Sequence, residues 1–444
     1  MKLVAFHAAD GDCLLLLSGD NPPRRVLVDG GRKGSFEQNT RAFLAALPGD
    51  GAGAAGLDVV CVSHIDDDHI SGILRLVEDE VEWRVFEFLN TGPNPPPPPE
   101  FPRPPAIGEV WHNGLFRLVG DEVGSEPEIV LSNVATLLAG SPDERVRERA
   151  SELDDLATGE RSSMELSRRL SPEQLQIPLN PRTGGALIKR STTGPAGPGE
   201  HVTLGSLDVL LLGPSEDDIV KLRKKWKTWI ADSRDALDKL HREMLADEER
   251  LGTLSPQLVA NPMLDQALGE GLNKVTEANL ASIMLLVEEG ASTALLTGDG
   301  VSSEILEGLD RHNKLDAQKR IHVNLLKVQH HGAKANVTTD FVQQVTADHY
   351  LFCGNGAHDN PEVEVVQKFA QARLTGIEGK PAVGPATAFH FWFTSSPETP
   401  DDSDGKDRQK HMKKVKEAVD LLRQGHEARM TATFIKEGHL QIDL

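Results

Sequence analysis

Short apolar runs separated by turn residues open the chain and predict three β-strands. Asp10-Gly11-Asp12, between the first two runs, is typical of a turn. Residues 36–47 then have helical apolar spacing, and Leu57–Val62 is predominantly apolar, as in a buried strand. Strands that alternate with a helix indicate a layered α/β architecture. The three runs are Leu3–Phe6, Cys13–Leu17 and Arg25–Val28.

The middle of the chain has a different pattern, dominated by charged helical stretches. Residues 125–180 are helix-prone, and residues 215–250 place two tryptophans on one face of an amphipathic helix, a stripe more typical of packing than of recognition. Between them we expect a loop over 181–200 and a strand over Val202–Leu212. Apart from that strand, we interpret about 120–275 as a helix-rich insertion.

Regular strand patterns return after the insertion, so the two ends of the chain are predicted to build one domain over residues 1–400. Residues 401–444 are expected to add a C-terminal helix and strand that close it. The proline-rich stretch 93–105 is interpreted as a stiff spacer, with binding to a proline-reading domain as the alternative. The later strands are predicted over Ala281–Val287, Ala294–Thr297, Val323–Val328 and Tyr350–Cys353.

Composition places the chain among globular proteins. Of its 444 residues, 39% are hydrophobic and 26% are charged, which is enough apolar material for a packed core. No stretch approaches the roughly 18 consecutive apolar residues of a membrane span, and the first residues lack the apolar core of a signal peptide. We therefore expect a cytoplasmic protein with no membrane partner. The three cysteines are far apart, which excludes a disulfide framework and a Cys-based zinc site.

The formal net charge of −21 limits the class of partner. Such a chain repels nucleic acid and anionic membranes at a distance. Binding of a phosphate polymer would therefore need local basic groups or metal ions that overcome the repulsion. The helical insertion and the proline-rich stretch are the candidate surfaces for a protein partner.

The strongest chemical signal is Ser63-His64-Ile65-Asp66-Asp67-Asp68-His69, which directly follows an apolar strand. This loop brings two imidazoles and up to three carboxylates to one point. Crowded carboxylates repel one another unless a cation lies among them, and mixed nitrogen and oxygen ligands suit Zn²⁺ or Mn²⁺. The loop therefore predicts a metal site, with a solvated acidic turn as the alternative. The expected ligands are His64, Asp66, Asp68 and His69.

Later strand ends add further candidate ligands. Asp299 lies between two glycines after an apolar strand, where its carboxylate would reach a metal without steric hindrance. Strand alternation sends His330 and His331 to different sides. We expect His331 to be the ligand and His330 to support it or to contact substrate, with the reverse assignment as the alternative. His358 follows another strand and is compatible with a ligand or with an ordinary loop histidine.

Taken in order, these motifs resemble those of the metallo-β-lactamase fold. The 64–69 loop resembles its first metal motif, HxHxDH, with Asp66 in place of the second His. This HxDxDH form is similar to that of the C-terminal hydrolase domain of the DNA-uptake channel protein ComEC and its stand-alone relatives. The matching motifs lie within residues 1–75 and 275–370. The other matches are Asp29-Gly30-Gly31, Asn279-Leu280-Ala281-Ser282, Leu295-Leu296-Thr297-Gly298-Asp299, the segment from Leu326 to Ala333 and the segment from Gly356 to Val363.

The resemblance implies a four-layer αββα sandwich of the α/β class, interrupted by the helical insertion. It also implies a hydrolase with two divalent metal ions, Zn²⁺ or Mn²⁺, which activate a bridging water. In such a site Asp299 bridges the metals, and His358 is a last ligand or stabilises the leaving oxygen. The implied metal ligands are His64, Asp66, Asp68, His69, Asp299, His331 and His358. The residues expected in catalysis are Asp68, His330 and His358, and those expected to contact substrate are Lys334 and Asn355.

Two departures from the family pattern bear on the metal. Asp66 in place of a His makes one site harder, which shifts its preference towards Mn²⁺ or Mg²⁺. The third His motif of the family has no recognisable match. His112 and His201 are the available candidates, and neither stands in a signature.

Fold does not determine substrate, because this fold hosts several kinds of hydrolase. Relatives of this type are associated with nucleic-acid degradation, which makes a phosphodiesterase or nuclease the leading interpretation. One alternative is a hydrolase of small molecules such as a cyclic nucleotide, a lactone or a thioester. The other is a partner-binding subunit with a vestigial site. Stand-alone relatives are also similar to proteins of bacterial antiviral operons, which connects the interpretation to antiviral defence.

Overall fold

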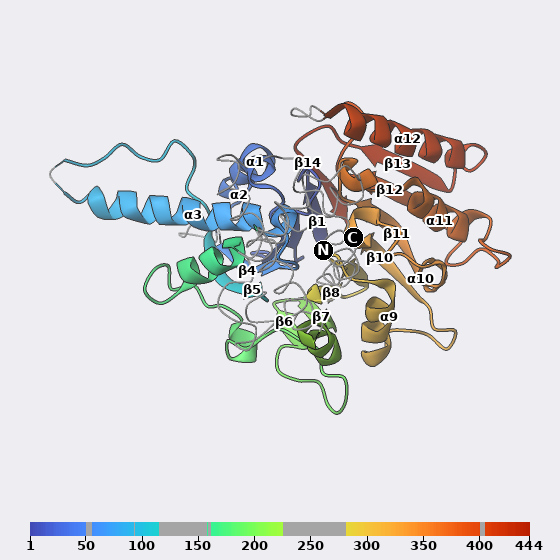
Figure 1. Ribbon diagram of the computed structural model, residues 1–444, viewed down its shortest axis with the longest axis horizontal. Helices are drawn as coiled ribbons and strands as arrows, with labels where there is room; N and C mark the ends of the chain where they lie inside the picture. The colour runs from blue at the N-terminus through green and yellow to red at the C-terminus, as the bar shows by residue number, and fades with distance from the viewer. Residues whose placement is uncertain (50–55, 93, 115–157, 159–160, 225–280, 400–404) are drawn as a thin grey trace, which may run out of the picture.

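Two β-sheets, each flanked by helices, form the folded body of the protein (Figure 1). The structure, a computed structural model, describes residues 1–49, 56–92, 94–114, 158, 161–224, 281–399 and 405–444. The chain is therefore of the α/β class, as its alternating strand and helix patterns predict.

The first sheet has six strands and is built by both ends of the chain. Neighbouring strands are antiparallel from β14 to β3 and parallel from β3 to β5. The C-terminal strand thus pairs with the N-terminal one, and the N–H of Leu444 donates to the carbonyl of Met1 at 3.0 Å. In spatial order the strands are β14 (His439–Asp443), β1 (Lys2–Phe6), β2 (Leu14–Leu17), β3 (Arg25–Val28), β4 (Gly56–Val62) and β5 (Ala106–His112).

The second sheet has eight strands. Neighbours are parallel from β13 to β9 and antiparallel from β9 to β6. Parallel neighbours need crossover connections, and these supply the helices outside this sheet. In spatial order the strands are β13 (Met430–Phe434), β12 (Phe389–Phe393), β11 (Val345–Phe352), β10 (Ile321–Lys327), β9 (Ser292–Leu296), β8 (Met284–Glu289), β7 (Leu207–Gly213) and β6 (His201–Leu204).

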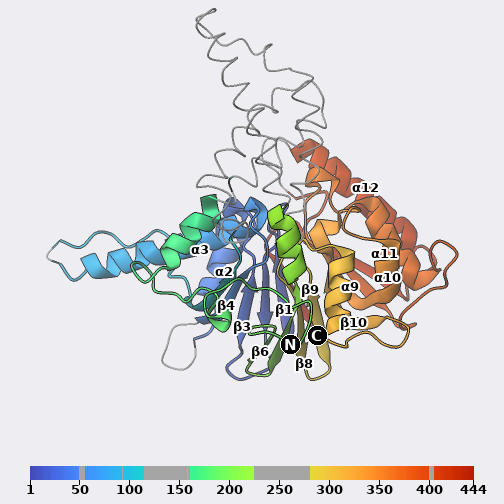
Figure 2. The same cartoon turned by 60° about the horizontal axis from the view of Figure 1, so that its bottom comes forward.

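The C-terminal end of α3 projects from the body of the molecule (Figure 2).

No helix in the described part of the chain is long and apolar enough to cross a membrane. The helices are α1 (Lys33–Ser35), the π-helical turn η1 (Phe36–Thr40), α2 (Arg41–Ala45), α3 (Asp67–Leu89), α9 (Ser302–Arg311), α10 (Thr339–Gln344), α11 (Val363–Leu374) and α12 (Gly405–Arg423), with helical residues also at 161–170 and 216–224. The 3₁₀ turns are η3 (Pro181–Thr183), η6 (Gln329–Gly332) and η7 (Ala357–Asp359).

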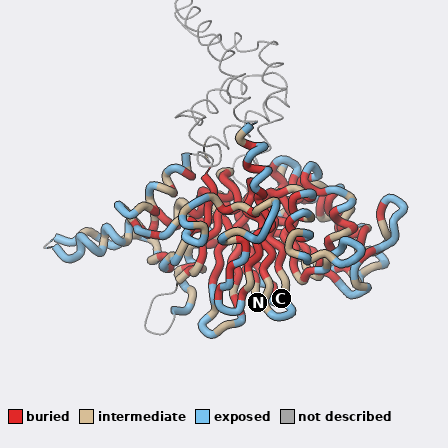
Figure 3. Tube along the Cα trace, turned by 90° about the horizontal axis from the view of Figure 1, so that it is seen from below, coloured by how far each residue is buried: buried red, intermediate tan, exposed pale blue. Residues whose placement is uncertain are grey.

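Alternation along the strands builds apolar cores in layers. Side chains such as Leu16 and Val59 of the first sheet pack against Leu285 and Leu325 of the second, so the sheets face each other. The other face of the first sheet packs against α2, α3 and the helix at 161–170. The other face of the second sheet packs against α9, α10, α11 and α12. Figure 3 shows the central strands buried along most of their length.

The strand predicted over Val202–Leu212 is wrong, because this segment is a hairpin. Leu204 pairs with Leu207 across a two-residue turn in which Gly205 has a left-handed φ of 58°. Glycine favours this conformation in tight hairpin turns. The spacing of three between the two leucines breaks the strand alternation and marks the turn.

The remaining predicted elements lie close to their expected positions. The helix predicted from residue 36 begins at Lys33, and the 64–69 loop is shorter than predicted because α3 begins at Asp67, where the helix dipole favours acidic residues. The other predicted strands are confirmed within a few residues. Residues 115–157 and 225–280, which include most of the predicted insertion and both tryptophans of its amphipathic helix, lie outside the described residues.

Candidate metal centre

The carboxyl ends of the parallel strands meet at one edge of the two sheets. The loops after β3 and β4 carry Asp29 and His64, and the loops after β9 and β10 carry Asp299 and His331. α3 follows the β4 loop directly, so its first turn joins the same edge. Ligands of α/β proteins bind beyond the carboxyl ends of strands. The fold therefore brings the predicted motifs from both ends of the chain to one place.

Seven side chains of the described residues converge at this edge in four overlapping groups, of which two contain Asp12 and the other two are built by five residues. The ligand atoms of His64, His69 and Asp299 lie within 4.8 Å of one another, and so do those of Asp68, His69 and His331. His69 Nε2 is 3.3 Å from Asp299 Oδ1, and His331 Nε2 is 3.1 Å from Asp68 Oδ2. His331 Nε2 also lies 3.6 Å from Asp299 Oδ2. We call these five residues the His–Asp cluster.

Four ligand atoms of the His–Asp cluster are buried and make no hydrogen bond of regular geometry among the described residues. They are His64 Nε2, His69 Nε2, His331 Nε2 and Asp299 Oδ1. Three of them lie at ion-pair distance from another member of the cluster. Buried polar atoms without a regular hydrogen bond are rare and call for an explanation. Four of them aimed at a common region fit the donor set of a divalent cation.

Two buried aspartates orient the imidazoles of the cluster. Asp29 Oδ2 lies 3.0 Å from His69 Nδ1, and the backbone N–H of Ser63 donates to Asp29 Oδ1 at 2.7 Å. Asp12 Oδ1 lies 3.2 Å from His331 Nδ1. A carboxylate at Nδ1 holds the imidazole proton there and leaves Nε2 as the ligand atom. Both Nε2 atoms are therefore prepared to bind a metal.

Replacing Asp29 by Asn should weaken metal binding about 10- to 100-fold. The Asn amide can donate to His69 Nδ1, which would move the imidazole proton to Nε2 and block the ligand atom. Metal affinity measured by competition with a chromogenic chelator checks this. Asp58→Asn is the control, because Asp58 binds Arg24 and the backbone of Arg25 outside the His–Asp cluster. Equal affinities of the two variants would contradict the orienting role.

Close backbone approach holds α3 against the neighbouring loops. A Cβ atom on Gly11 would overlap the carbonyl oxygen of Asp68, and one on Gly30 would overlap the backbone of Gly72 and Ile73. Glycine at these positions therefore lets the chain approach so closely.

A tight turn, and not strand alternation, separates the two adjacent histidines. His330 and His331 both have left-handed φ angles, 46° and 53°, so the alternation expected after the strand does not apply to them. The turn places His331 inside the cluster. His330 is more exposed, at 30%, and its Nε2 lies 3.7 Å from Asp299 Oδ2. Its Nδ1 is 2.8 Å from Asn336 Oδ1.

Charge and burial act in opposite directions on the imidazoles. Burial lowers the pKa of His64 to about 4, against the effect of Asp299, so this imidazole is neutral, and its Nδ1 accepts from the backbone N–H of Asp66 at 3.2 Å. Burial alone would also lower the pKa of His69 and His331. The carboxylates around them, Asp299 foremost, instead raise that of His331 to about 10 and that of His69 well above its usual value. Protons on these two groups balance the carboxylates, and metal binding would release them.

Other predicted site residues lie around the cluster. Asp66 and His358 do not belong to the groups whose ligand atoms lie within 4.8 Å in the described residues. Asp66 Oδ2 is 3.4 Å from His64 Nδ1, and His358 is exposed in η7 with a left-handed φ of 52°. Lys334 is exposed and lies 3.1 Å from Glu362, whereas Asn355 is used locally, since its Oδ1 accepts from the N–H of Ala357.

The two candidates for the third histidine motif lie in different places. His112 ends β5 and pairs in register with Val62, so it lies at the same edge as the cluster, with Nε2 2.8 Å from Ser163 Oγ. His201 is exposed on the outermost strand β6, 3.1 Å from Asp208. Of the two, the structure places His112 at the relevant edge. Asn279 of the family motif lies outside the described residues.

Sequence reasoning missed three supporting residues. Asp12 was attributed to a turn, although it is fully buried and ion-paired with Lys327. Lys327 stands among apolar strand residues, and a lysine at such a buried position is the available signal of an internal ion pair. Asn336 holds the His330 ring while its Nδ2 donates to the carbonyl of Asp299 at 2.9 Å. Nothing in the sequence marks Asn336.

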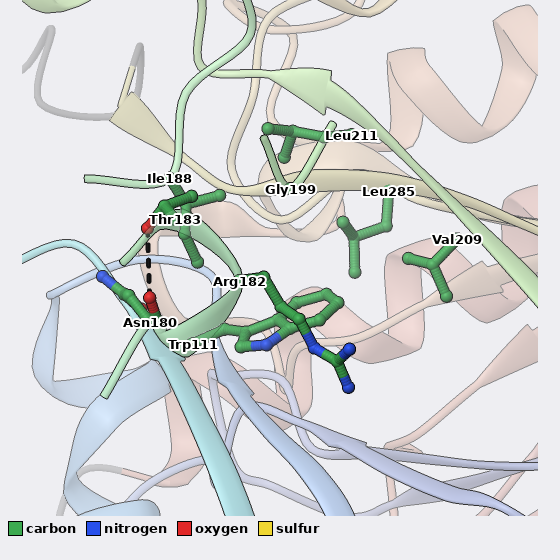
Figure 4. Close-up of a pocket in the computed structure, with 9 residues that line it drawn as sticks. All are labelled: Trp111, Asn180, Arg182, Thr183, Ile188, Gly199, Val209, Leu211 and Leu285. Atoms are coloured by element: carbon green, nitrogen blue, oxygen red, sulfur yellow. Dashed lines mark hydrogen bonds between the residues drawn. The ribbon is translucent and has the colours of Figure 1, made fainter. Parts of the chain in front are cut away.

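A separate hollow lies away from the His–Asp cluster (Figure 4). Figure 4 shows Arg182 beside the ring of Trp111, and both side chains donate to Glu109. The lining of this hollow contains no histidine, cysteine or carboxylate and is mostly apolar, so the hollow is not a metal site. The lining residues are Trp111, Asn180, Arg182, Thr183, Ile188, Gly199, Val209, Leu211 and Leu285.

Comparison with known proteins finds no family model that matches the chain and no curated protein that matches its sequence. The family resemblance of the motifs therefore remains an expectation beside the geometry of the His–Asp cluster.

Proposed function

We propose that the chain is a metal-dependent hydrolase of the metallo-β-lactamase fold that holds two divalent ions, Zn²⁺ or Mn²⁺, and acts on phosphodiesters. The observation that carries the proposal is the convergence of buried imidazole and carboxylate ligand atoms whose distances from one another are all within 4.8 Å in each group. The order of the sequence motifs and the two facing sheets support the family. The choice of phosphodiesters over lactones or thioesters rests on the resemblance.

The residues of the His–Asp cluster have separate roles in this proposal. His64, His69 and Asp299 would hold one ion, and Asp68 and His331 would contribute to the other. Bound ions supply positive charge to a developing oxyanion and lower the pKa of a water molecule. Burial of the cluster keeps bulk water from screening these charges.

In this proposal His330 would exchange a proton with substrate. Asn336 Nδ2 donates to the backbone of Asp299, so its Oδ1 faces His330 and accepts the proton on Nδ1. The Nε2 atom of His330 is then the basic nitrogen, on the more exposed side of the cluster. The tautomer and the ring orientation of His330 thus both follow from the side-chain amide of Asn336.

Elemental analysis combined with hydrolysis of bis(p-nitrophenyl) phosphate tests the proposed function. Nearly two ions per chain and turnover with added Mn²⁺ or Zn²⁺ are expected. Asp68→Ala should lower turnover at least about a hundredfold, because it removes a ligand of the cluster. Asp67→Ala is the matched control, since Asp67 lies in the same helical turn but pairs with Arg32 at 2.8 Å.

The outcomes of this experiment separate the alternatives. Metal without turnover would redirect the search to lactone, thioester or lactam substrates. Neither metal nor turnover would overturn the proposal and favour a partner-binding protein.

A further inference from the structure

The first half of α12 carries a group of basic side chains in a strongly acidic chain. Lys410, Lys413 and Lys414 are exposed on one side of the helix, whereas His411 and Met412 are buried on the other. Residues three and four apart share a helix face. The only acidic residue between 405 and 416 is Asp407. We call Lys410, Lys413 and Lys414 the α12 lysine face.

The spacing of these lysines is unfavourable for the isolated helix. Lys410 faces Lys413 and Lys414 at like-charge spacings. Lys413 lies 4.0 Å from Glu417, and both side chains are about 70% exposed, so this pair compensates little. An anionic partner would remove this repulsion.

The buried side of α12 reaches the loop beside the His–Asp cluster through a short chain of contacts. His411 Nδ1 is 3.0 Å from Asp359, and His411 Nε2 is 3.0 Å from the carbonyl of Pro361. Pro361 packs on Gly332, the residue after His331, closely enough that a Cβ there would lie 2.8 Å from the proline ring. Figure 2 shows α12 at the end of the molecule opposite the two chain termini. The loop that follows β11 thus connects α12 to the His–Asp cluster.

We propose that the α12 lysine face binds the phosphate backbone of a nucleic acid strand that enters the His–Asp cluster. This inference rests on the proposed function. His411 contacts the loop beside the cluster, whereas the lysines lie across the helix, whose diameter with side chains is about 10 Å. A ligand that reaches both regions must therefore extend beyond a single nucleotide. A local basic face is also what an acidic protein needs in order to hold a phosphate polymer.

Salt-dependent binding tests this inference without relying on turnover. The probe is a fluorescently labelled single-stranded phosphorothioate oligonucleotide, which resists hydrolysis, and its affinity is measured over a series of KCl concentrations. In the variant Lys410→Ala/Lys413→Ala/Lys414→Ala, the slope of log affinity against log salt should fall by about 2, since each contact to a single strand contributes about 0.7. Hydrolysis of bis(p-nitrophenyl) phosphate should stay at the wild-type value.

A charge-matched variant completes the experiment. Lys2→Ala/Lys319→Ala/Lys380→Ala removes three exposed lysines from segments that lead into strands, at the opposite edge of the sheets. It should retain the wild-type slope. Equal slopes in all proteins, or the same loss in both triple variants, would overturn the inference. So would lysine-dependent binding to vesicles containing phosphatidylserine without binding to the oligonucleotide.

The two proposals fail in different ways. Loss of oligonucleotide binding in the α12 variant, with neither bound metal nor bis(p-nitrophenyl) phosphate turnover in any protein, would support the lysine face as a binding surface and overturn the hydrolase. Normal turnover with unchanged oligonucleotide binding would support the hydrolase and overturn the lysine face.

Discussion

Asp299→Asn should remove bound metal and lower phosphodiester turnover by about a thousandfold or more. Asp299 contacts both groups of the cluster, because its Oδ1 lies 3.3 Å from His69 and its Oδ2 lies 3.6 Å from His331. Its burial raises the pKa of the carboxyl, but the surrounding histidines lower it well below its usual value. The side chain is therefore a carboxylate at the centre of the cluster. Asn preserves the shape and removes the charge.

Elemental analysis and steady-state hydrolysis of bis(p-nitrophenyl) phosphate measure this effect together. Asp310→Asn is the matched control, since Asp310 is exposed on α9 and pairs with Lys319. Wild-type metal content and turnover in Asp299→Asn would contradict a metal hydrolase centred on this residue. A protein whose role is to bind a partner should keep that binding in both variants.

Lys327→Met should lower the free energy of unfolding by about 3–5 kcal/mol. Lys327 and Asp12 form an ion pair in which each side chain is only 1% exposed, and Lys327 Nζ also donates to the carbonyl of Gly298 at 2.9 Å. Burial opposes both charges, yet Asp12 raises the pKa of Lys327, and Lys327 together with His331 lowers that of Asp12 to about 2. Removing the lysine leaves a buried carboxylate without its principal counterion.

Chemical denaturation of the metal-free protein, prepared with a chelator, gives this free energy. Lys314→Met is the control, because Lys314 pairs with Glu288 at 2.7 Å at a site where both side chains are more than a quarter exposed. Its effect should stay within about 1 kcal/mol. The double variant Asp12→Asn/Lys327→Met should recover part of the loss, since it no longer buries an unpaired charge. A loss in Lys327→Met as small as in the control would show that His331 suffices to balance Asp12.

Comparing Asp299→Asn with Lys327→Met separates residues that bind metal from residues that stabilise the fold around the metal site. Asp299 belongs to the ligand cluster, so its loss should change metal content first. Lys327 pairs closely with the buried Asp12 and lies farther, at 3.8 Å, from Asp299 Oδ1, so its loss should change stability first. Measuring the metal content and the free energy of unfolding of both variants tests this difference between Asp299 and Lys327.

Local patterns in the sequence determined most of the strands and the chemistry of the 64–69 motif. Apolar runs such as Val59–Val62 specify strands because burial on both faces requires continuous apolar side chains. The crowding of carboxylates and imidazoles between His64 and His69 indicates a cation because like charges repel at short range. Both properties depend on residues close in sequence.

Tertiary structure decided what depends on residues far apart. Asp12 became a buried partner of Lys327, more than 300 positions away, because β1 and β10 end at the same edge. The left-handed turn at His330 and His331 placed His331 in the cluster, which strand alternation could not predict. The proximity of α12 to the cluster likewise came from packing on the loop after β11. A side chain's chemistry is set by its type, but its role is set by neighbours that only the folded chain supplies.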